Sequence, residues 1–163
     1  MKKVILFLLL FGALLPVRAQ LNQQLIKPNE EVIFTFLLKN QKRATVAMDK
    51  DEKYIVYRFG SPAKVELEFP GSTDERSWTQ FTFRGYERGG GKANAALSYG
   101  FLSFNNKGID YEVYDTWDSE DDSVTCGITV TINGKTTDLK GIVKTRKGYL
   151  LNLLDNVRIK KEE

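Results

Sequence analysis

The chain has 163 residues, with 24 Lys and Arg against 21 Asp and Glu, one cysteine and no histidine. Without histidine there is no general base of the usual kind at neutral pH, no His-ligated zinc, and no Ser-His or Cys-His nucleophile. A single cysteine excludes an intramolecular disulfide, so a buried apolar core has to supply the stability of the fold.

An export signal is predicted at the start of the chain. Two lysines precede an apolar run, Val4–Leu15, and Pro16–Ala19 offers a small-residue cleavage site. The run is short for a bilayer core, which favours a cleaved signal over a retained membrane anchor. We therefore expect residues 1–19 to be a signal peptide and residues 20–163 to form a single β domain, periplasmic or secreted.

The predicted cleavage changes the charge of the protein. Residues 1–19 contain three basic residues and no acid, so the remaining chain has 21 residues of each sign. Its formal net charge is zero, which indicates neither nucleic acid nor an anionic membrane as a partner.

Short segments with alternating apolar residues fill the first part of the domain. A polar lead-in is followed by four predicted strands, at residues 32–39, 42–48, 53–59 and 64–69. Charged residues at Asp49–Glu52 are typical of a turn between two of these strands, and Pro70-Gly71 ends the last one.

The middle of the chain continues the pattern. A strand with Phe81 and Phe83 on one face ends at a glycine run, and a helical turn can follow at Ala93–Leu97. The apolar register changes near Gly100, which predicts a β-bulge there. Asn105–Gly108 is a predicted hairpin loop leading into the next strand.

The last part contains the clearest strand, Val124–Ile132, with a strict period of two. Asn133-Gly134 favours a type I′ turn, which pairs this strand with Lys135–Val143. A basic turn, a short helix or strand at 149–154 and a closing strand at Val157–Ile159 complete the chain. About ten short strands and no sustained helical period predict an all-β fold, an antiparallel β-barrel or sandwich.

The most unusual segment is Arg88-Gly89-Gly90-Gly91-Lys92-Ala93-Asn94. Three glycines can form a nest of backbone N–H groups, and the flanking cations favour an anionic or protein ligand. The alternative is a tight hairpin or bulge in which Arg88 and Lys92 are merely solvated. We expect at least one of the three glycines to have a positive φ. The predicted ligand-binding residues are Arg88, Gly89, Gly90, Gly91, Lys92, Asn94, Trp78 and Tyr86.

Five carboxylates cluster in a predicted acidic loop, from Asp115 to Ser123. Calcium binds such oxygen ligands, but the spacing does not match an EF-hand, so a solvated loop is the favoured interpretation and no metal site is predicted. Cys126 is in phase with the apolar residues of its strand, which predicts a buried structural thiol rather than an intermolecular bridge or a reactive centre.

Other carboxylates and aromatic residues leave a second chemistry open. Glu66 and Glu68 share one face of a strand, where an exposed polar stripe is the favoured interpretation. Several aromatic side chains can stack on sugar rings or belong to the core. They are Tyr57, Trp78, Tyr86, Tyr99, Tyr114 and Trp117.

Several blocks resemble an uncharacterised family of small exported bacterial β proteins. They are Tyr54–Gly60, Val65–Pro70, Trp78 with Phe81, Tyr86–Gly91, Asn94, Leu102–Phe104 and Tyr111–Tyr114. The resemblance covers roughly residues 34–145; it implies a secreted β fold and supplies no activity. In architecture alone the chain is also similar to bacterial lysozyme inhibitors, although their Ser-Gly loop motif and disulfide are absent.

These observations predict an exported binding or inhibitory module, monomeric, without catalytic chemistry or a cofactor. Its partner is an unknown protein or glycan of the cell envelope. The alternatives are a carboxylate-dependent hydrolase acting on carbohydrate or cell-wall material, and a structural component of the envelope.

Overall fold

The computed structural model describes residues 25–61, 63–92 and 94–162, so the predicted signal peptide lies outside the described residues. This part of the chain forms eleven strands in two sheets that do not close into a barrel. The all-β prediction is confirmed, and of its two forms the structure is the sandwich.

The smaller sheet has the order β10-β1-β2-β3-β4, and all its neighbouring strands are antiparallel. Its strands are β1 (Glu30–Leu37), β2 (Arg43–Asp49), β3 (Ile55–Ser61), β4 (Lys64–Phe69) and β10 (Lys147–Gly148). The first four strands follow each other along the chain, as the alternating sequence pattern predicts, and the C-terminal part adds β10 at the edge.

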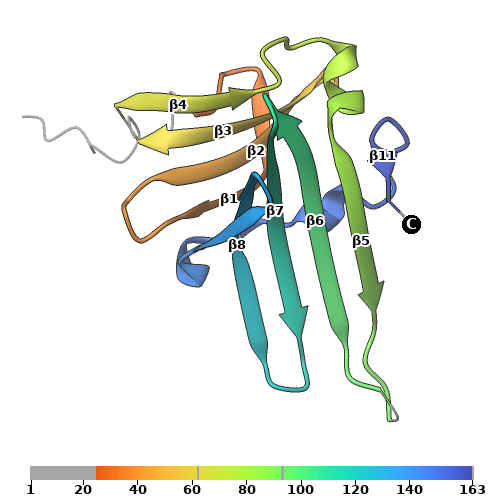
Figure 1. Ribbon diagram of the computed structural model, residues 1–163. Coiled ribbons are helices and arrows are strands. Elements are labelled where there is room, and N and C mark those ends of the chain that lie inside the picture. The colour runs from red at the N-terminus through yellow and green to blue at the C-terminus, as the bar shows by residue number, and fades with distance from the viewer. Residues whose placement is uncertain (1–24, 62, 93, 163) are drawn as a thin grey trace, which may run out of the picture.

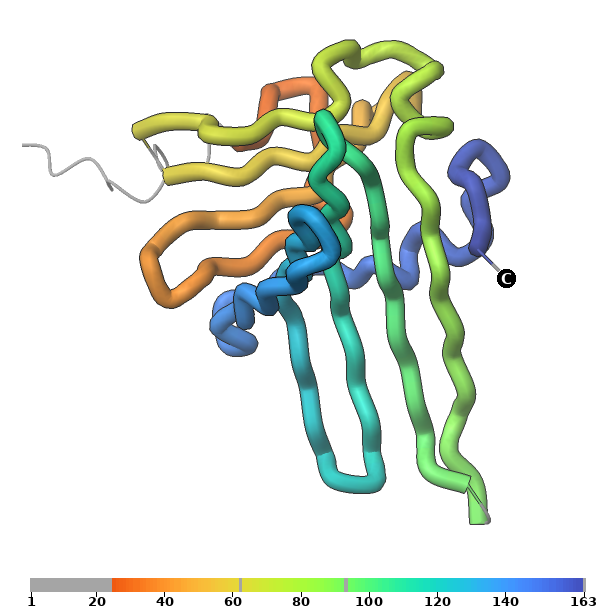
Figure 2. The backbone as a smooth tube through the Cα atoms, viewed as in Figure 1, coloured from red at the N-terminus to blue at the C-terminus, as the bar shows by residue number. Residues whose placement is uncertain are grey.

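The larger sheet has the order β11-β5-β6-β7-β8-β9. Its strands are β5 (Thr82–Arg88), β6 (Leu97–Asn106), β7 (Ile109–Asp118), β8 (Ser123–Ile132), β9 (Lys135–Lys140) and β11 (Lys160–Lys161). All are antiparallel to their neighbours except β11, which is parallel to β5. The strands of the smaller sheet run across those of the larger one, and the lower ends of β5 to β8 extend past it (Figures 1 and 2).

Three short 3₁₀ helices connect and cover the sheets. They are η1 (Glu75–Gln80), η2 (Val143–Thr145) and η3 (Leu150–Leu153). Helix η1 links the two sheets, and the C-terminal segment that contains η2 and η3 passes across the middle of the larger sheet (Figure 1).

Aromatic side chains from both sheets form the core. Phe69 stacks on Phe104, with ring centroids 4.4 Å apart, and Phe104 in turn stacks on Tyr111 at 5.0 Å. Trp78 of η1 is only 1% exposed, and its indole N–H donates to the Glu52 carbonyl at 3.1 Å. The Trp78 side chain therefore belongs to the core rather than to a surface site.

A buried ion-pair network holds the outer face of the smaller sheet. The Arg58 side chain is 1% exposed and donates to both carboxylate oxygens of Glu30, at 2.6 and 2.9 Å. It also donates to the Leu25 carbonyl at 3.1 Å and to Glu68. Glu68, assigned from the sequence to an exposed polar stripe, is therefore a partner of a buried cation.

The two predicted hairpin turns are confirmed. Lys107 and Gly108 have φ of 55° and 83°, and Asn133 and Gly134 have φ of 49° and 77°. Both central residues thus lie in the left-handed region, as a type I′ turn requires.

The predicted bulge at Gly100 is wrong. Strand β6 keeps one register, with Gly100 opposite Gly85 on β5 and Asp115 on β7. The glycine serves a close approach instead, because a Cβ at this position would lie 2.8 Å from the Cβ of Leu150 in η3. The apparent change of register in the sequence is simply the change from the outer to the inner face of the sheet.

Three further boundaries differ from the prediction. The closing strand is β11, Lys160–Lys161, rather than residues 157–159. Strand β9 ends at Lys140 rather than at Val143, which begins η2. Residues 94–96 form no helix, and β6 begins at Leu97. Backbone pairing with distant strands decides these boundaries, and local residue patterns contain little information about it.

The close packing at Gly100 predicts a stability difference between two glycines. Gly100→Ala should lower the free energy of unfolding by about 1–3 kcal/mol, because the added methyl overpacks the contact with Leu150. Gly91→Ala is the matched control, since nothing lies within 4 Å of its Cβ position, and should stay within about 0.5 kcal/mol of the parent. Urea denaturation measures both, and equal midpoints would contradict tight seating of η3 on β6.

The ionisation of Glu30 should make the stability of the protein depend on pH. Burial alone raises the pKa of Glu30, but hydrogen bonds from Arg58, the Lys27 N–H and Tyr54 outweigh it and hold that pKa below its ordinary value. The ionised carboxylate therefore contributes stability above the unfolded pKa, and this contribution is lost as the pH falls through the lower folded pKa. Below about pH 4.3, the parent should lose stability more steeply than Glu30→Gln in thermal melts. Parallel curves would contradict the role of the network.

Candidate functional site

The predicted glycine site lies at the lower tip of the larger sheet, in the connection between β5 and β6 (Figure 1). Arg88, Lys92 and Asn94 line an open hollow there, together with Gly90 and Gly91 and with Ser119 and Glu120 from the β7–β8 turn. The Arg88 Nε donates to the Ala95 carbonyl at 3.2 Å rather than to an acid. Its side chain thus helps to hold its own loop.

The backbone of the glycine loop is tied to the neighbouring turn. The Ala96 N–H donates to the Ser119 hydroxyl at 2.8 Å, and the Ser119 N–H donates to the Ala96 carbonyl at 3.0 Å. None of Gly89, Gly90 and Gly91 has a φ in the left-handed region, so that prediction is wrong. The glycines form a side-chain-free tip.

The two predicted aromatic members of the site do not join the loop. Trp78 is buried in η1, at the opposite end of β5 from the glycine loop (Figure 1). Tyr86 is 42% exposed on the outer face of the sheet, with its ring centroid 5.7 Å from that of Tyr99. The structure therefore brings the basic and glycine residues together but separates them from Trp78.

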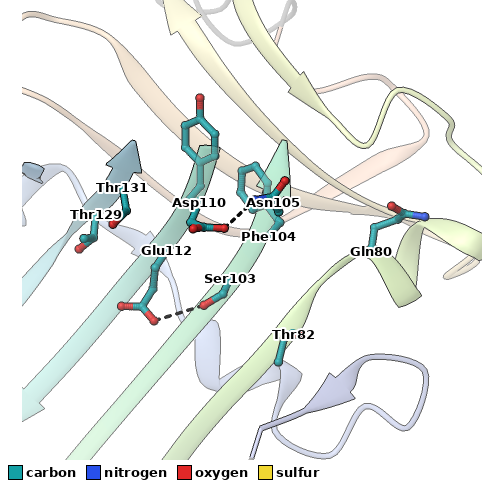
Figure 3. A pocket seen from close by; sticks show the side chains of 10 residues that line it. Gln80, Thr82, Ser103, Phe104, Asn105, Asp110, Glu112, Thr129 and Thr131 are labelled. Carbon is teal, nitrogen blue, oxygen red and sulfur yellow. Dashed lines mark hydrogen bonds between the residues drawn. The ribbon is translucent and has the colours of Figure 1, made fainter. Parts of the chain in front are cut away.

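A second hollow lies on the outer face of the larger sheet, with a volume of about 420 Å³ (Figure 3). Glu112 accepts from the Ser103 hydroxyl at 3.2 Å, and Asp110 accepts from the Asn105 amide at 2.7 Å. Both carboxylates in this shallow hollow are thus already engaged by neighbours on the same sheet.

The third hollow, which we call the inner-face pocket, has a volume of about 560 Å³. Its lining comes from β5 to β8 and from the C-terminal segment. The residues are Glu87, Ser98, Asp115, Thr116, Trp117, Val124, Arg146, Tyr149, Leu151 and Asn152. It combines aromatic and aliphatic surface with a few polar groups, as small-ligand sites do.

Strand register explains why this pocket exists. Three rows cross the inner face of the larger sheet, and each is two residues further along the strands than the one before. The first row consists of the core residues Phe83, Leu102, Val113 and Ile128. The second row consists of Gly85, Gly100, Asp115 and Cys126. The third row consists of Glu87, Ser98, Trp117 and Val124. Helix η3 covers the second row, and the third row is left as the floor of the pocket.

The glycines of the second row allow η3 to lie close to the sheet. Leu150 packs against Gly100, and the Leu151 side chain reaches within 3.4 Å of the Cβ position of Gly85. With no side chains at these two places, η3 lies directly on the sheet. Tyr149, Leu151 and Asn152 then stand beside the uncovered third row and form one side of the pocket.

A partly buried ion pair forms part of the lining of the inner-face pocket. Arg146 donates to the carboxylate of Asp115, whose side chain is 6% exposed. Burial raises the pKa of Asp115, with the charge and hydrogen bond of Arg146 and a hydrogen bond from the Leu150 N–H acting in the opposite direction. The guanidinium of Arg146 also lies 5.1 Å from the ring centroid of Tyr149.

Asp115 does not belong to an acidic loop as predicted. Strand β7 continues to Asp118, and only Ser119–Asp122 form the turn. The carboxylate of Asp115 faces inward to Arg146, while Asp118 accepts the Glu120 N–H at 2.8 Å and Asp121 accepts the Ser123 N–H at 3.1 Å. Within the described ranges no group of three or more acidic or thiol side chains is placed to hold a metal ion.

Cys126 is opposite Asp115 on β8 and is 2% exposed. Burial, followed by the nearby charge of Asp115, raises the pKa of the thiol to about 11. A thiol with this pKa stays protonated and packs as a small apolar side chain. The predicted burial of Cys126 is confirmed.

Sequence reasoning missed much of the inner-face pocket. It named Trp117 among the aromatic residues and Asp115 among the acids, but it did not connect them with Arg146, Tyr149 or Asn152. Asp115 and Arg146 are 31 residues apart, so no local motif relates them. The available signal for the pocket was a single acidic residue, Asp115, at an inward-facing position of an otherwise apolar strand pattern.

The different positions of the two tryptophans allow a direct test of this geometry. Trp117 lines the pocket and Trp78 is buried. In Trp78→Phe, where Trp117 is the remaining fluorophore, acrylamide should quench the emission readily. In Trp117→Phe the emission from Trp78 should be several times less sensitive. Similar Stern–Volmer slopes for two folded variants would contradict an open pocket beside Trp117.

No helix in the described part of the chain is long and apolar enough to cross a membrane. No protein-family model, curated protein or solved structure matches the chain. The function therefore has to be argued from the site itself.

Proposed function

We propose that the protein is an exported, monomeric binding module that holds a small ligand, or the end of a larger one, in the inner-face pocket. The observation that carries this proposal is the Asp115–Arg146 pair beside the aromatic side chains of Trp117 and Tyr149. The predicted signal peptide supports the location in the periplasm or outside the cell.

The walls of the pocket are held in place before any ligand arrives. Trp117 and Val124 lie on paired strands, and η3 is seated on Gly85 and Gly100. Asp115 fixes Arg146 by an ion pair and accepts the Leu150 N–H. Such preorganisation reduces the conformational entropy lost on binding, which favours a binding role for this pocket.

The glycine loop is a weaker candidate. Its hollow is open, its glycines form no left-handed nest, and Arg88 bonds to the backbone of its own loop. A binding role for Arg88 and Lys92 remains our second proposal, because both cations are exposed at the tip of the sheet.

A carboxylate-dependent hydrolase is the alternative function. Glu87 and Asp115 both line the inner-face pocket, and the raised pKa of Asp115 is a feature of general acids in glycoside hydrolysis. However, Asp115 is bound by Arg146 and by the Leu150 N–H, which ties its carboxylate to a structural role. We therefore favour binding without turnover.

The proposal predicts which variants lose ligand capture. The domain from Gln20 onward would be immobilised and exposed to envelope extract, and the retained molecules would be identified by mass spectrometry. Trp117→Ala should abolish retention of the specific ligand, because it removes the floor of the pocket. Tyr86→Ala on the outer face and Arg88→Ala in the glycine loop are matched controls that should retain it.

Two outcomes would reverse the assignment. Loss of the ligand in Arg88→Ala together with retention in a folded Trp117→Ala would move the site to the glycine loop. Chemical conversion of the ligand by the parent, abolished in Glu87→Gln, would favour the hydrolase.

A further inference from the structure

We propose that the ligand of the inner-face pocket is a saccharide, and this inference rests on the binding role proposed above. Two features support it: aromatic surface in the pocket, and hydrogen-bonding groups of both kinds around it. The residues that carry the argument are Trp117, Tyr149, Arg146, Glu87 and Asn152.

The aromatic part suits the apolar face of a pyranose ring. Trp117 is half-buried in its row between Ser98 and Val124, and its side chain forms part of the pocket lining. Tyr149 also lines the pocket, is 56% exposed, and has the Arg146 guanidinium 5.1 Å from its ring centroid. Both residues have an apolar body with a polar edge, which suits a ligand that is itself amphipathic.

The polar part offers donors and acceptors within the same hollow. Arg146 uses one terminal nitrogen for Asp115 and has further N–H groups, and the Asn152 amide supplies both a donor and an acceptor. Glu87 contributes an exposed carboxylate, and Ser98 a hydroxyl. Sugar hydroxyls donate and accept at once, so a mixed lining of this kind satisfies them better than a lining of one type.

The charge and shape of the pocket argue against other ligand classes. The lining contains one guanidinium, that of Arg146, and two carboxylates, those of Asp115 and Glu87, so a phosphate-rich ligand meets excess negative charge. An alkyl chain requires a closed apolar cavity, whereas here Ser98 and Asn152 interrupt the lining.

The test uses the emission of Trp117 in Trp78→Phe and calorimetry with the unsubstituted domain, so that a folding defect in the variant cannot decide the result. The probes are the trisaccharides of β-1,4-linked N-acetylglucosamine, of β-1,4-linked glucose and of α-1,4-linked glucose, with inorganic phosphate and laurate as the other classes. We expect saturable binding of at least one trisaccharide and none of phosphate or laurate.

Variants separate stacking from a general structural effect. Tyr149→Ala should weaken saccharide binding by about tenfold through the lost ring contact, and Tyr149→Phe should largely restore it. Tyr86→Ala on the outer face should leave binding unchanged.

The saccharide inference and the binding role can fail separately. If no trisaccharide binds in either measurement, the saccharide inference is overturned, and retention of another ligand that depends on Trp117 would leave the pocket as a binding site. If laurate or phosphate binds in place of sugar, the ligand class is wrong. If no ligand from envelope extract depends on Trp117 either, the binding role of the pocket falls as well.

Discussion

The fold depends on how the inner face of the larger sheet is covered. The aromatic core between the two sheets covers the row of Phe83, Leu102, Val113 and Ile128. Because β5 to β8 extend past the smaller sheet, another segment has to cover the adjacent row (Figure 2). Helix η3 does so by lying on Gly85 and Gly100, and the third row is left open. Core packing and the candidate pocket are thus two consequences of one mismatch in strand length.

Buried charges help to attach the segments that precede β1 and follow β9. Arg58 connects β3 with Glu30 and with the Leu25 carbonyl, and so attaches the segment before β1. Asp115 connects β7 with Arg146 and with the start of η3, and so attaches the segment after β9. Removing one partner of such a pair leaves an uncompensated buried charge, which costs several kcal/mol. In the second case the fixed guanidinium also faces the pocket, so the same contact serves stability and the proposed site.

Much of the fold could be predicted from the sequence, but little of the site. Alternation of apolar residues gave the strands, and Asn133-Gly134 gave the hairpin, because both signals act over a few neighbouring residues. The glycine run predicted a binding site because it is a rare local pattern. Its backbone, however, is not left-handed, and Trp78, predicted as a member of the same site, lies in the core. The glycines that shape the candidate pocket, Gly85 and Gly100, are single residues inside strands, and their purpose depends on a helix much later in the chain.

The sequence by itself determined the all-β class, the hairpins at Asn105–Gly108 and Asn133-Gly134, and the burial of Cys126, since each follows from alternation or from turn chemistry. Only the tertiary structure decided that the sheets form a sandwich, that Asp115 faces inward, and that Arg146, Tyr149 and Trp117 line one pocket. The physical reason is the sequence separation of the contacts involved. Alternation of apolar residues acts between near neighbours and shows that a strand has two different faces. The choice of the covered face, and of the segment that covers it, depends on contacts between residues far apart in the chain.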